Sequence, residues 1–271
     1  MLRFHPSSVG LLMSDAQSID RALVPAELLH IFDKPRKSDA DREALAPYKE
    51  MSLSAGAKTH LRQLAKEYVY GYRKVVENKY LDKGLAMESE AIAFINRVRF
   101  KRYEKNTERR KNDFLTGECD IYVPGVKTID TKCSWDLSTF PAFEEDAHDS
   151  LYEWQGRAYM SLWDVPEHEV VYVMLDTPDD LLKPWERDSN DVLALHRVGH
   201  IEQDLRLTSI TYQRCPIMEA KLERKCRQAQ AYLQALVDRI KAQHGIIEHD
   251  EEPAAPAAPA TDWRTEFLQQ A

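Results

Sequence analysis

The sequence predicts an α/β fold in which a mixed central sheet is flanked by helices, with further helices near both ends of the chain. Helical periodicity fills residues 54–97 and 217–244, strand-like segments follow one another between residues 99 and 135, and a continuous apolar run at 168–176 suits a buried strand. We expect a single domain over residues 1–247, followed by a Pro/Ala-rich linker and a short terminal segment at 248–271.

The helical region 54–97 is expected to break near Asp82–Gly84, with a second helix over residues 85–98. Glu88 lies three and four residues before Ala91 and Ile92, so it shares the apolar face of that second helix, whereas Glu90 points elsewhere. The apolar positions expected in the first part of the region are Leu61, Leu64, Tyr68 and Val69.

Three strand-like segments come next: RFKRY at 99–103, DFLTGECDIYV at 113–123 and VKTIDTKCSW at 126–135. In the second segment, alternation places Leu115, Cys119, Ile121 and Val123 on one face and Glu118, Asp120 and Tyr122 on the other. A helix is expected over 149–163 and a fourth strand over 168–176. Between residues 178 and 213 the signals are mixed, and we predict no element there.

Acidic side chains converge in this arrangement. Asp120 and Asp130 lie on adjacent strands joined by a short turn, and Glu88 faces inward from the preceding helix. Buried carboxylates aimed at one point imply a bound cation, and ligands that are all oxygen suit Mg²⁺, with Mn²⁺ as a substitute. Lys132 lies two residues after Asp130, on the same face, where it can activate a metal-bound water. The alternative is an exposed ion pair between Asp130 and Lys132.

At this point the sequence resembles the PD-(D/E)XK nucleases, whose pattern is a helix glutamate, an aspartate and then [D/E]-x-K. The segments GLAMESEAI (84–92), GECDIYV (117–123), TIDTKCS (128–134) and YEWQGRAYM (152–160) are similar to those of lambda-type phage exonucleases and their RecB-like and YqaJ-like relatives. The resemblance implies a restriction-endonuclease-like core. It also implies that Glu88, Asp120, Asp130 and the Thr131 carbonyl hold the metal, while Lys132 activates water.

Gln155 and Tyr159 match the Q-x-x-x-Y motif of these relatives, four residues apart on one helix face. They would hold the DNA backbone or order the catalytic lysine; the alternative is a buried tyrosine beside a solvated glutamine. Ser7 and Ser8 resemble the serine that helps hold a 5′-phosphate in the lambda-type enzymes, although a helix N-cap is the plainer reading. The upstream arginine of those enzymes has no clear match beyond Arg3.

The resemblance implies a Mg²⁺-dependent exonuclease that degrades linear double-stranded DNA from its ends, 5′ to 3′, in phage-type recombination beside a single-strand annealing protein. A structure-specific or restriction-like endonuclease and a catalytically inactive DNA-binding module are the alternatives. The expected location is the cytoplasm of a bacterial host, with a phage or prophage origin. The sequence leaves open whether the chain forms a homo-oligomer.

Charge and composition restrict the partners. The net charge is −8, yet residues 97–111 hold eight Lys or Arg against two Glu, and we expect Arg109, Arg110 and Lys111 to contact DNA phosphates unless the run is only solvated surface. No apolar run is long enough for a membrane span, and four cysteines without C-x-x-C spacing fit a reducing compartment. The terminal DWRTEFL is expected to be a tethered ligand for a partner, a helix folded back on its own domain, or a disordered end.

Overall fold

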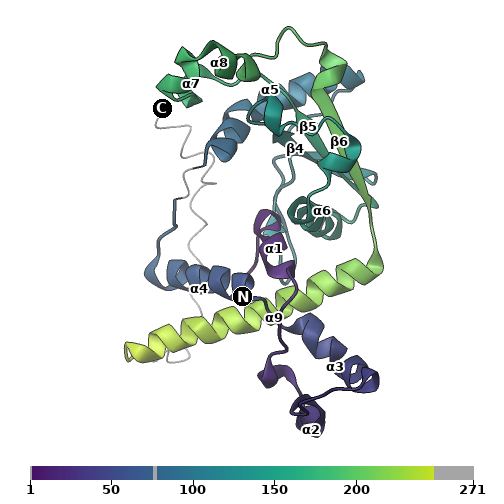
Figure 1. Cartoon of the computed structure of the whole chain (residues 1–271), viewed down its shortest axis with the longest axis vertical. Helices are drawn as coiled ribbons and strands as arrows, with labels where there is room; N and C mark the ends of the chain where they lie inside the picture. Colours follow the sequence, from purple (N-terminus) through teal and green to yellow (C-terminus); the bar gives the residue numbers. More distant parts are fainter. Residues whose placement is uncertain (1, 76–77, 247–271) are drawn as a thin grey trace.

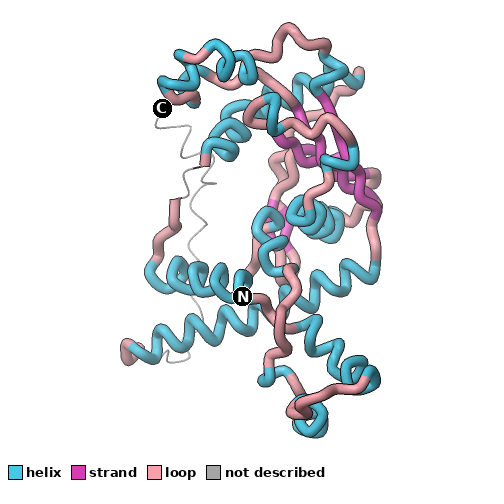
Figure 2. The backbone as a smooth tube through the Cα atoms, viewed as in Figure 1, coloured by secondary structure: helices cyan, strands magenta, loops and turns pink. Residues whose placement is uncertain are grey.

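A four-stranded mixed sheet forms the centre of the computed structural model, which describes residues 2–75 and 78–246. Its strands, in spatial order, are β3 (Ile121–Val123), β4 (Lys127–Cys133), β5 (Glu167–Val173) and β6 (Leu207–Gln213). β4 and β5 are parallel, whereas β3 and β6 run antiparallel to their neighbours. The predicted mixed sheet is confirmed, and Figure 2 shows it surrounded by helices.

Helices α5 (Lys79–Arg99) and α6 (Ser150–Trp163) cover opposite faces of this sheet (Figure 1). Successive side chains of a strand point to opposite faces. Ile129 of β4 is therefore buried with the apolar residues of α5, whereas the next residue, Asp130, contacts Gln155 of α6. The side-chain period of β4 thus decides which residues reach α6.

A helical layer lies beyond α6, formed by α1 (Pro6–Met13), α4 (Ala55–Tyr70) and α9 (Pro216–Gln243), and α4 runs beside the long α9 in Figure 1. These helices bury Val9, Leu61 and Leu222 in the same core cluster as Ala158 of α6. The expected helices near both ends are confirmed. The remaining described α-helices are α2 (Leu29–Phe32), α3 (Asp39–Met51), α7 (Pro184–Asp188) and α8 (Asn190–His196).

The boundary between α4 and α5 lies at residues 71–78, not at Asp82–Gly84 as predicted. α4 ends at Gly71, which has a left-handed φ of 64°, and α5 begins where the Asn78 side chain accepts a hydrogen bond from the Tyr80 amide. Residues 82–84 therefore belong to the first turns of α5. Tyr68, expected on the apolar face of α4, is 57% exposed.

The fully buried Lys83 fixes this first part of α5 to the sheet. Its ammonium donates to the carbonyl oxygens of Trp135 and Leu175, at 3.0 and 2.8 Å, and to the Thr177 hydroxyl at 2.9 Å. The two carbonyls lie just beyond the ends of β4 and β5. The amino end of α5 is therefore held at the carboxyl ends of the two parallel strands.

One of the predicted strands is wrong, and a second is divided into two shorter strands. Residues 99–103 form none, because α5 continues to Arg99 and residues 100–109 are neither helix nor strand. The predicted strand 113–123 divides into β3 and β2 (Thr116–Gly117), which pairs with β1 (Arg110–Lys111). The division also separates side chains that were expected on one face. Leu115 and Cys119 pack in the apolar cluster that includes α6, whereas Ile121 and Val123 pack in the cluster that includes α5.

Residues 178–213, for which no element was predicted, contain α7, α8 and the edge strand β6. β6 pairs along the whole of β5, from Leu207 opposite Val173 to Gln213 opposite Glu167. The predicted terminal linker and DWRTEFL lie outside the described residues. Within residues 2–75 and 78–246, no helix combines the length and apolar character that crossing a membrane requires.

Candidate active site

The end of β3 places the Asp120 carboxylate at the edge of the sheet. β3 begins at Ile121, which pairs with Ile129 of β4, and Asp120 is the residue just before this first paired position. Asp120 Oδ2 then accepts hydrogen bonds from the Thr131 amide at 2.7 Å and the Thr131 hydroxyl at 2.8 Å. The side chain thereby satisfies a β4 amide that lies beyond the paired length of β3. Asp120 is consequently buried beside the middle of β4.

Asp130 and Lys132 point together toward α6. Lys132 Nζ lies 2.6 Å from Asp130 Oδ2, and the Gln155 side-chain amide donates to Asp130 Oδ1 at 3.0 Å. The same ammonium donates to Gln155 Oε1 at 3.4 Å and lies 4.2 Å from the centre of the Tyr152 ring. Asp130 is buried and Lys132 partly exposed, so this is not the exposed ion pair of the alternative reading.

Tyr159 continues the cluster one turn further along α6. Its hydroxyl donates to the Glu118 carbonyl at 2.6 Å, and the Gln155 amide nitrogen lies 3.5 Å from it. Burial, with the Asp130 and Asp120 charges, raises the pKa of Tyr159 well above its usual value, so it remains a neutral phenol. The structure thus brings Gln155 and Tyr159 to the carboxylates, and Gln155 is buried rather than solvated.

The charges of this cluster are unequal. Burial, followed by the Asp130 charge, raises the pKa of Asp120 even though Thr131 donates two hydrogen bonds to it. Burial lowers the pKa of Lys132, but Asp130 and its neighbours outweigh burial, so the pKa is raised and Lys132 is an ammonium at neutral pH. One ammonium between two buried carboxylates leaves a deficit of positive charge.

Glu88 does not join these carboxylates in one cluster. Its Oε2 forms an ion pair with Lys105 Nζ at 2.9 Å, and its buried Oε1 has no hydrogen-bond partner among the described residues. In the described chain, no three Asp, Glu, His or Cys side chains are arranged to hold a metal ion. The reason is that α5 approaches from the opposite face of the sheet to α6, and the loop after α5 supplies Lys105 as a counter-charge.

Glu88 nevertheless lies near the carboxyl end of β4, as Asp120 does. Burial raises the pKa of Cys133 to about 12, and the Asp120 and Glu88 charges both add to the shift, against Lys83. The Asn106 amide, next to Lys105, donates to the Asp120 carbonyl at 2.7 Å. The net negative charge of the group formed by Asp120, Asp130 and Lys132, the unpartnered Glu88 Oε1 and a donor set of oxygens alone fit a hard divalent cation such as Mg²⁺.

Ser7 and Ser8 lie in the first turn of α1. The Ser8 hydroxyl donates to the His5 carbonyl at 3.0 Å, and Ser7 is exposed. Pro6 of the same turn packs against Gly117, where a Cβ atom would come within 2.5 Å of the proline ring. The start of α1 therefore lies against the segment that leads to Glu118 and Asp120. Neither serine caps α1, which begins after His5 without a side-chain cap.

Two of the three basic residues expected to contact DNA are already paired within the chain. Arg109 forms an ion pair with Glu118 at 2.6 Å, and Arg110 forms one with Glu108 at 2.8 Å. The Arg110 guanidinium also lies 5.0 Å from the centre of the Tyr122 ring. Lys111, in contrast, is exposed, with no ion pair to any described residue. The structure therefore reduces the free positive charge of this run.

His168 is a fully buried residue next to Tyr159, and the sequence did not predict its place beside the site. It pairs in register with Thr128, whose hydroxyl lies 2.8 Å from His168 Nδ1, and its ring lies 5.7 Å from the Tyr159 ring. Gly156 of α6 touches the same ring, since a Cβ atom there would lie 2.2 Å from His168 Cδ2. A histidine at the start of the buried strand segment 168–176 is the only signal in the sequence.

We expect acid to destabilise the protein through His168. Burial, and to a lesser degree Lys132, lowers the pKa of His168 to about 3, while Glu169 acts in the opposite direction. Because the folded pKa lies below the unfolded value of about 6.5, the unfolded state binds the proton first, and stability falls as the pH drops from about 6.5 toward 3. The loss attributable to this residue is at most about 5 kcal/mol.

Urea denaturation between pH 7.5 and pH 5 measures this effect. The free energy of unfolding should decrease over that interval in the parent protein and decrease less in His168→Asn, which has no proton to gain. An equal decrease in both proteins would show that other groups, such as paired carboxylates, cause the acid sensitivity.

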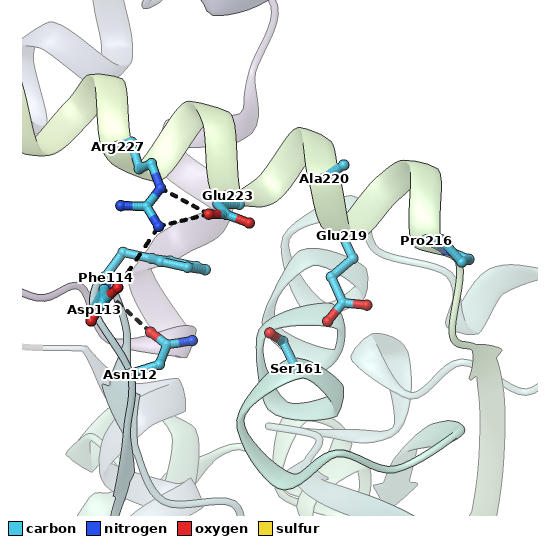
Figure 3. Close-up of a pocket in the computed structure, with 9 residues that line it drawn as sticks. All are labelled: Asn112, Asp113, Phe114, Ser161, Pro216, Glu219, Ala220, Glu223 and Arg227. Carbon is cyan, nitrogen blue, oxygen red and sulfur yellow. Dashed lines mark hydrogen bonds and ion pairs between the residues drawn. The ribbon is translucent and has the colours of Figure 1, made fainter.

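A hollow beside the site does not belong to it. Figure 3 shows it between α9, Ser161 of α6 and residues 112–114. Its acidic residues are already paired, because Glu219 pairs with Arg214, and Glu223 and Asp113 both pair with Arg227. None of the carboxylates or the lysine around Asp130 lines it, so the chemistry described above does not take place there.

The fold is found in known proteins. The chain is similar to a phage-related exonuclease from Haemophilus somnus 129PT, with 32% identity, a TM-score of 0.71, and coverage of 88% of this chain and 96% of that one. It shares its fold with the alkaline exonuclease LHK-Exo from Laribacter hongkongensis, with 12% identity, a TM-score of 0.58, and coverage of 90% and 93%.

A structure of LHK-Exo in complex with dAMP is similar over 72% of this chain and 89% of that one, with 14% identity and a TM-score of 0.53. Neither a protein-family model nor a curated protein matches the chain.

Proposed function

Because this chain belongs to the phage-related, lambda-type exonucleases of the PD-(D/E)XK superfamily, we propose that it hydrolyses phosphodiester bonds of linear double-stranded DNA from the ends, 5′ to 3′, with Mg²⁺. The observation that carries the proposal is the cluster of Asp120, Asp130, Lys132 and Gln155 at the open edge of the sheet. Mn²⁺ would substitute for Mg²⁺.

The metal would be held by Asp120, Asp130 and the Thr131 carbonyl, with Glu88 as a further ligand once it leaves Lys105. When bound, Mg²⁺ supplies an acidified water and neutralises charge on the scissile phosphate. Lys132 is an ammonium in this environment, so its contribution is to orient the attacking water and to oppose the negative charge that develops on the phosphate. Asp130 and Gln155 hold that ammonium in place.

Gln155 and Tyr159 keep the cluster ordered from α6. The Gln155 amide contacts Asp130 and Lys132 at once, which fixes the relative positions of the carboxylate and the ammonium. Tyr159 ties α6 to the Glu118 carbonyl, two residues before Asp120. We propose that Ser7, Ser8 and Lys111 meet DNA phosphates near this edge, with the serines at the 5′ end.

Digestion of linear duplex DNA tests the proposal. With Mg²⁺, the protein should release nucleotides from an end-labelled linear duplex, faster with a 5′-phosphate than without one. Covalently closed circular DNA should survive, because it offers no end. Cleavage of the circle would instead show that the protein is a structure-specific or restriction-like endonuclease. If neither substrate is cleaved, the protein is a catalytically inactive DNA-binding module.

The proposed biological setting rests on the same family resemblance. We propose that the enzyme resects DNA ends for phage-type recombination inside a bacterial host cell, and that a single-strand annealing protein receives the strand it exposes. Co-purification of the full chain with such a protein, compared with a chain lacking residues 253–271, tests whether the terminal segment provides the contact.

A further inference from the structure

The carboxyl end of α5 exposes an aromatic side chain at a backbone position that disfavours it. Phe100, which follows α5, has φ 53° and ψ 43°, the left-handed conformation that glycine adopts at helix ends without steric cost. Its side chain is nevertheless 95% exposed. The Asn96 carbonyl holds this backbone by accepting hydrogen bonds from the Phe100 and Lys101 amides, whereas the almost fully exposed ring gains little from packing within the described chain and is open to an intermolecular contact.

The surrounding backbone is firmly held. Arg99 forms an ion pair with Glu169 at 2.8 Å, and the Asn96 side chain exchanges two hydrogen bonds with the Tyr103 backbone, at 2.6 and 2.8 Å. Tyr103 itself packs against the α5 core. The exposed position of Phe100 is therefore fixed by the loop that closes between residues 96 and 103.

The exposed cations next to Phe100 indicate a polyanion. Arg97, Lys101 and Arg102 are all exposed and form no ion pair with a described residue, in a chain whose net charge is −8. The loop then leads back to the candidate active site, because Lys105 contacts Glu88 and the Asn106 amide contacts the Asp120 carbonyl. Phe100 lies 12 residues after Glu88, about 18 Å along the helix.

We propose that Phe100, with Lys101 and Arg102, forms a binding surface for single-stranded DNA, in which the phenyl ring stacks on an unpaired base and the cations contact the flanking phosphates. The inference rests on the proposed function, since a nuclease that resects one strand of a duplex leaves the other strand unpaired. A duplex hides its base faces, so the aromatic ring selects the single strand.

Phe100→Gly separates binding from folding. Glycine removes the ring and also relieves the left-handed strain, so the melting temperature should stay the same or rise. Affinity for a fluorescein-labelled single-stranded oligonucleotide, measured by anisotropy in EDTA to prevent hydrolysis, should fall about tenfold, because stacking contributes that much per base. Phe100→Trp should retain the affinity, and affinity for a blunt duplex should change little in either variant.

Phe143→Ala is the matched control. Phe143 is 63% exposed and has an ordinary extended backbone, but Glu144, Glu145 and Asp146 follow it. Loss of this ring should leave oligonucleotide affinity unchanged. Similarly, Lys101→Gln with Arg102→Gln should reduce the slope of log affinity against log salt by about 1.4, whereas Arg109→Gln with Arg110→Gln should change it little, because those guanidinium groups are already paired.

Unchanged oligonucleotide affinity in Phe100→Gly would overturn the proposal, as would an equal loss for the duplex. A drop in the molar mass of the assembly without loss of affinity would overturn it too, since it would show that Phe100 contacts a second copy of the chain. If the parent protein binds the oligonucleotide but does not cut DNA when Mg²⁺ is added, the proposed nuclease function fails while this surface stands.

Discussion

Lys132→Ala should reduce DNA hydrolysis by about a thousandfold or more in saturating Mg²⁺, while the protein stays folded and binds DNA nearly as well as the parent. The variant removes the ammonium that opposes the charge of the reacting phosphate, and such preorganised charges account for factors of this size. It removes no carboxylate, so the ligands proposed for the metal remain. Single-turnover digestion of a linear duplex and anisotropy of the same duplex in EDTA measure the two effects separately.

Lys127→Ala provides the matched control on the same strand. Lys127 is also an ion-paired lysine of β4, 2.6 Å from Glu169, but it lies five residues earlier and on the α5 side of the sheet. Its loss should leave the rate of hydrolysis within about twofold of the parent. If Lys132→Ala digests DNA at the parental rate, or if both lysine variants lose activity equally, Lys132 has no special part in the reaction.

Gly156→Ala should destabilise the protein by about 3 kcal/mol or prevent it from folding. A methyl group at this position would lie 2.2 Å from His168 Cδ2 and 2.7 Å from Cγ. The ring cannot move aside easily, because it is fully buried and Thr128 holds its Nδ1 at 2.8 Å. Equilibrium urea denaturation of the purified variant, or loss of soluble protein, measures the effect.

Gly84→Ala tests whether the effect comes from the contact rather than from glycine itself. Gly84 is also inside a helix, and a Cβ atom there would meet nothing within 4 Å among the described residues. This variant should be more stable by about 0.5–1 kcal/mol, since alanine favours a helix interior. Adding His168→Ala to Gly156→Ala should recover part of the lost stability; additive losses in the double variant would contradict the proposed clash.

The sequence by itself determined which side chains of β4 and of α6 share a face. A strand has a side-chain period of two, so Asp130 and Lys132 had to share a face wherever the strand was placed. A helix has a period near 3.6, so Gln155 and Tyr159 had to share one as well. Both relations hold between near neighbours in the chain, and the structure brings all four side chains together.

Only the tertiary structure decided how distant segments meet this strand. Asp120 is placed by a β4 amide, because its carboxylate bonds to Thr131 where the pairing of β3 has ended. Glu88 is paired with Lys105 because the loop after α5 returns past it. Arg109 forms an ion pair with Glu118, because the antiparallel pairing of β1 and β2 brings the two residues close.

His168 shows the same limit most clearly. Its environment combines Thr128, Gly156 and Tyr159, which come from a neighbouring strand and a helix. Local periodicity states which side of an element a residue occupies. It does not state which residue of another element lies opposite, because that depends on strand register and on the packing of whole layers.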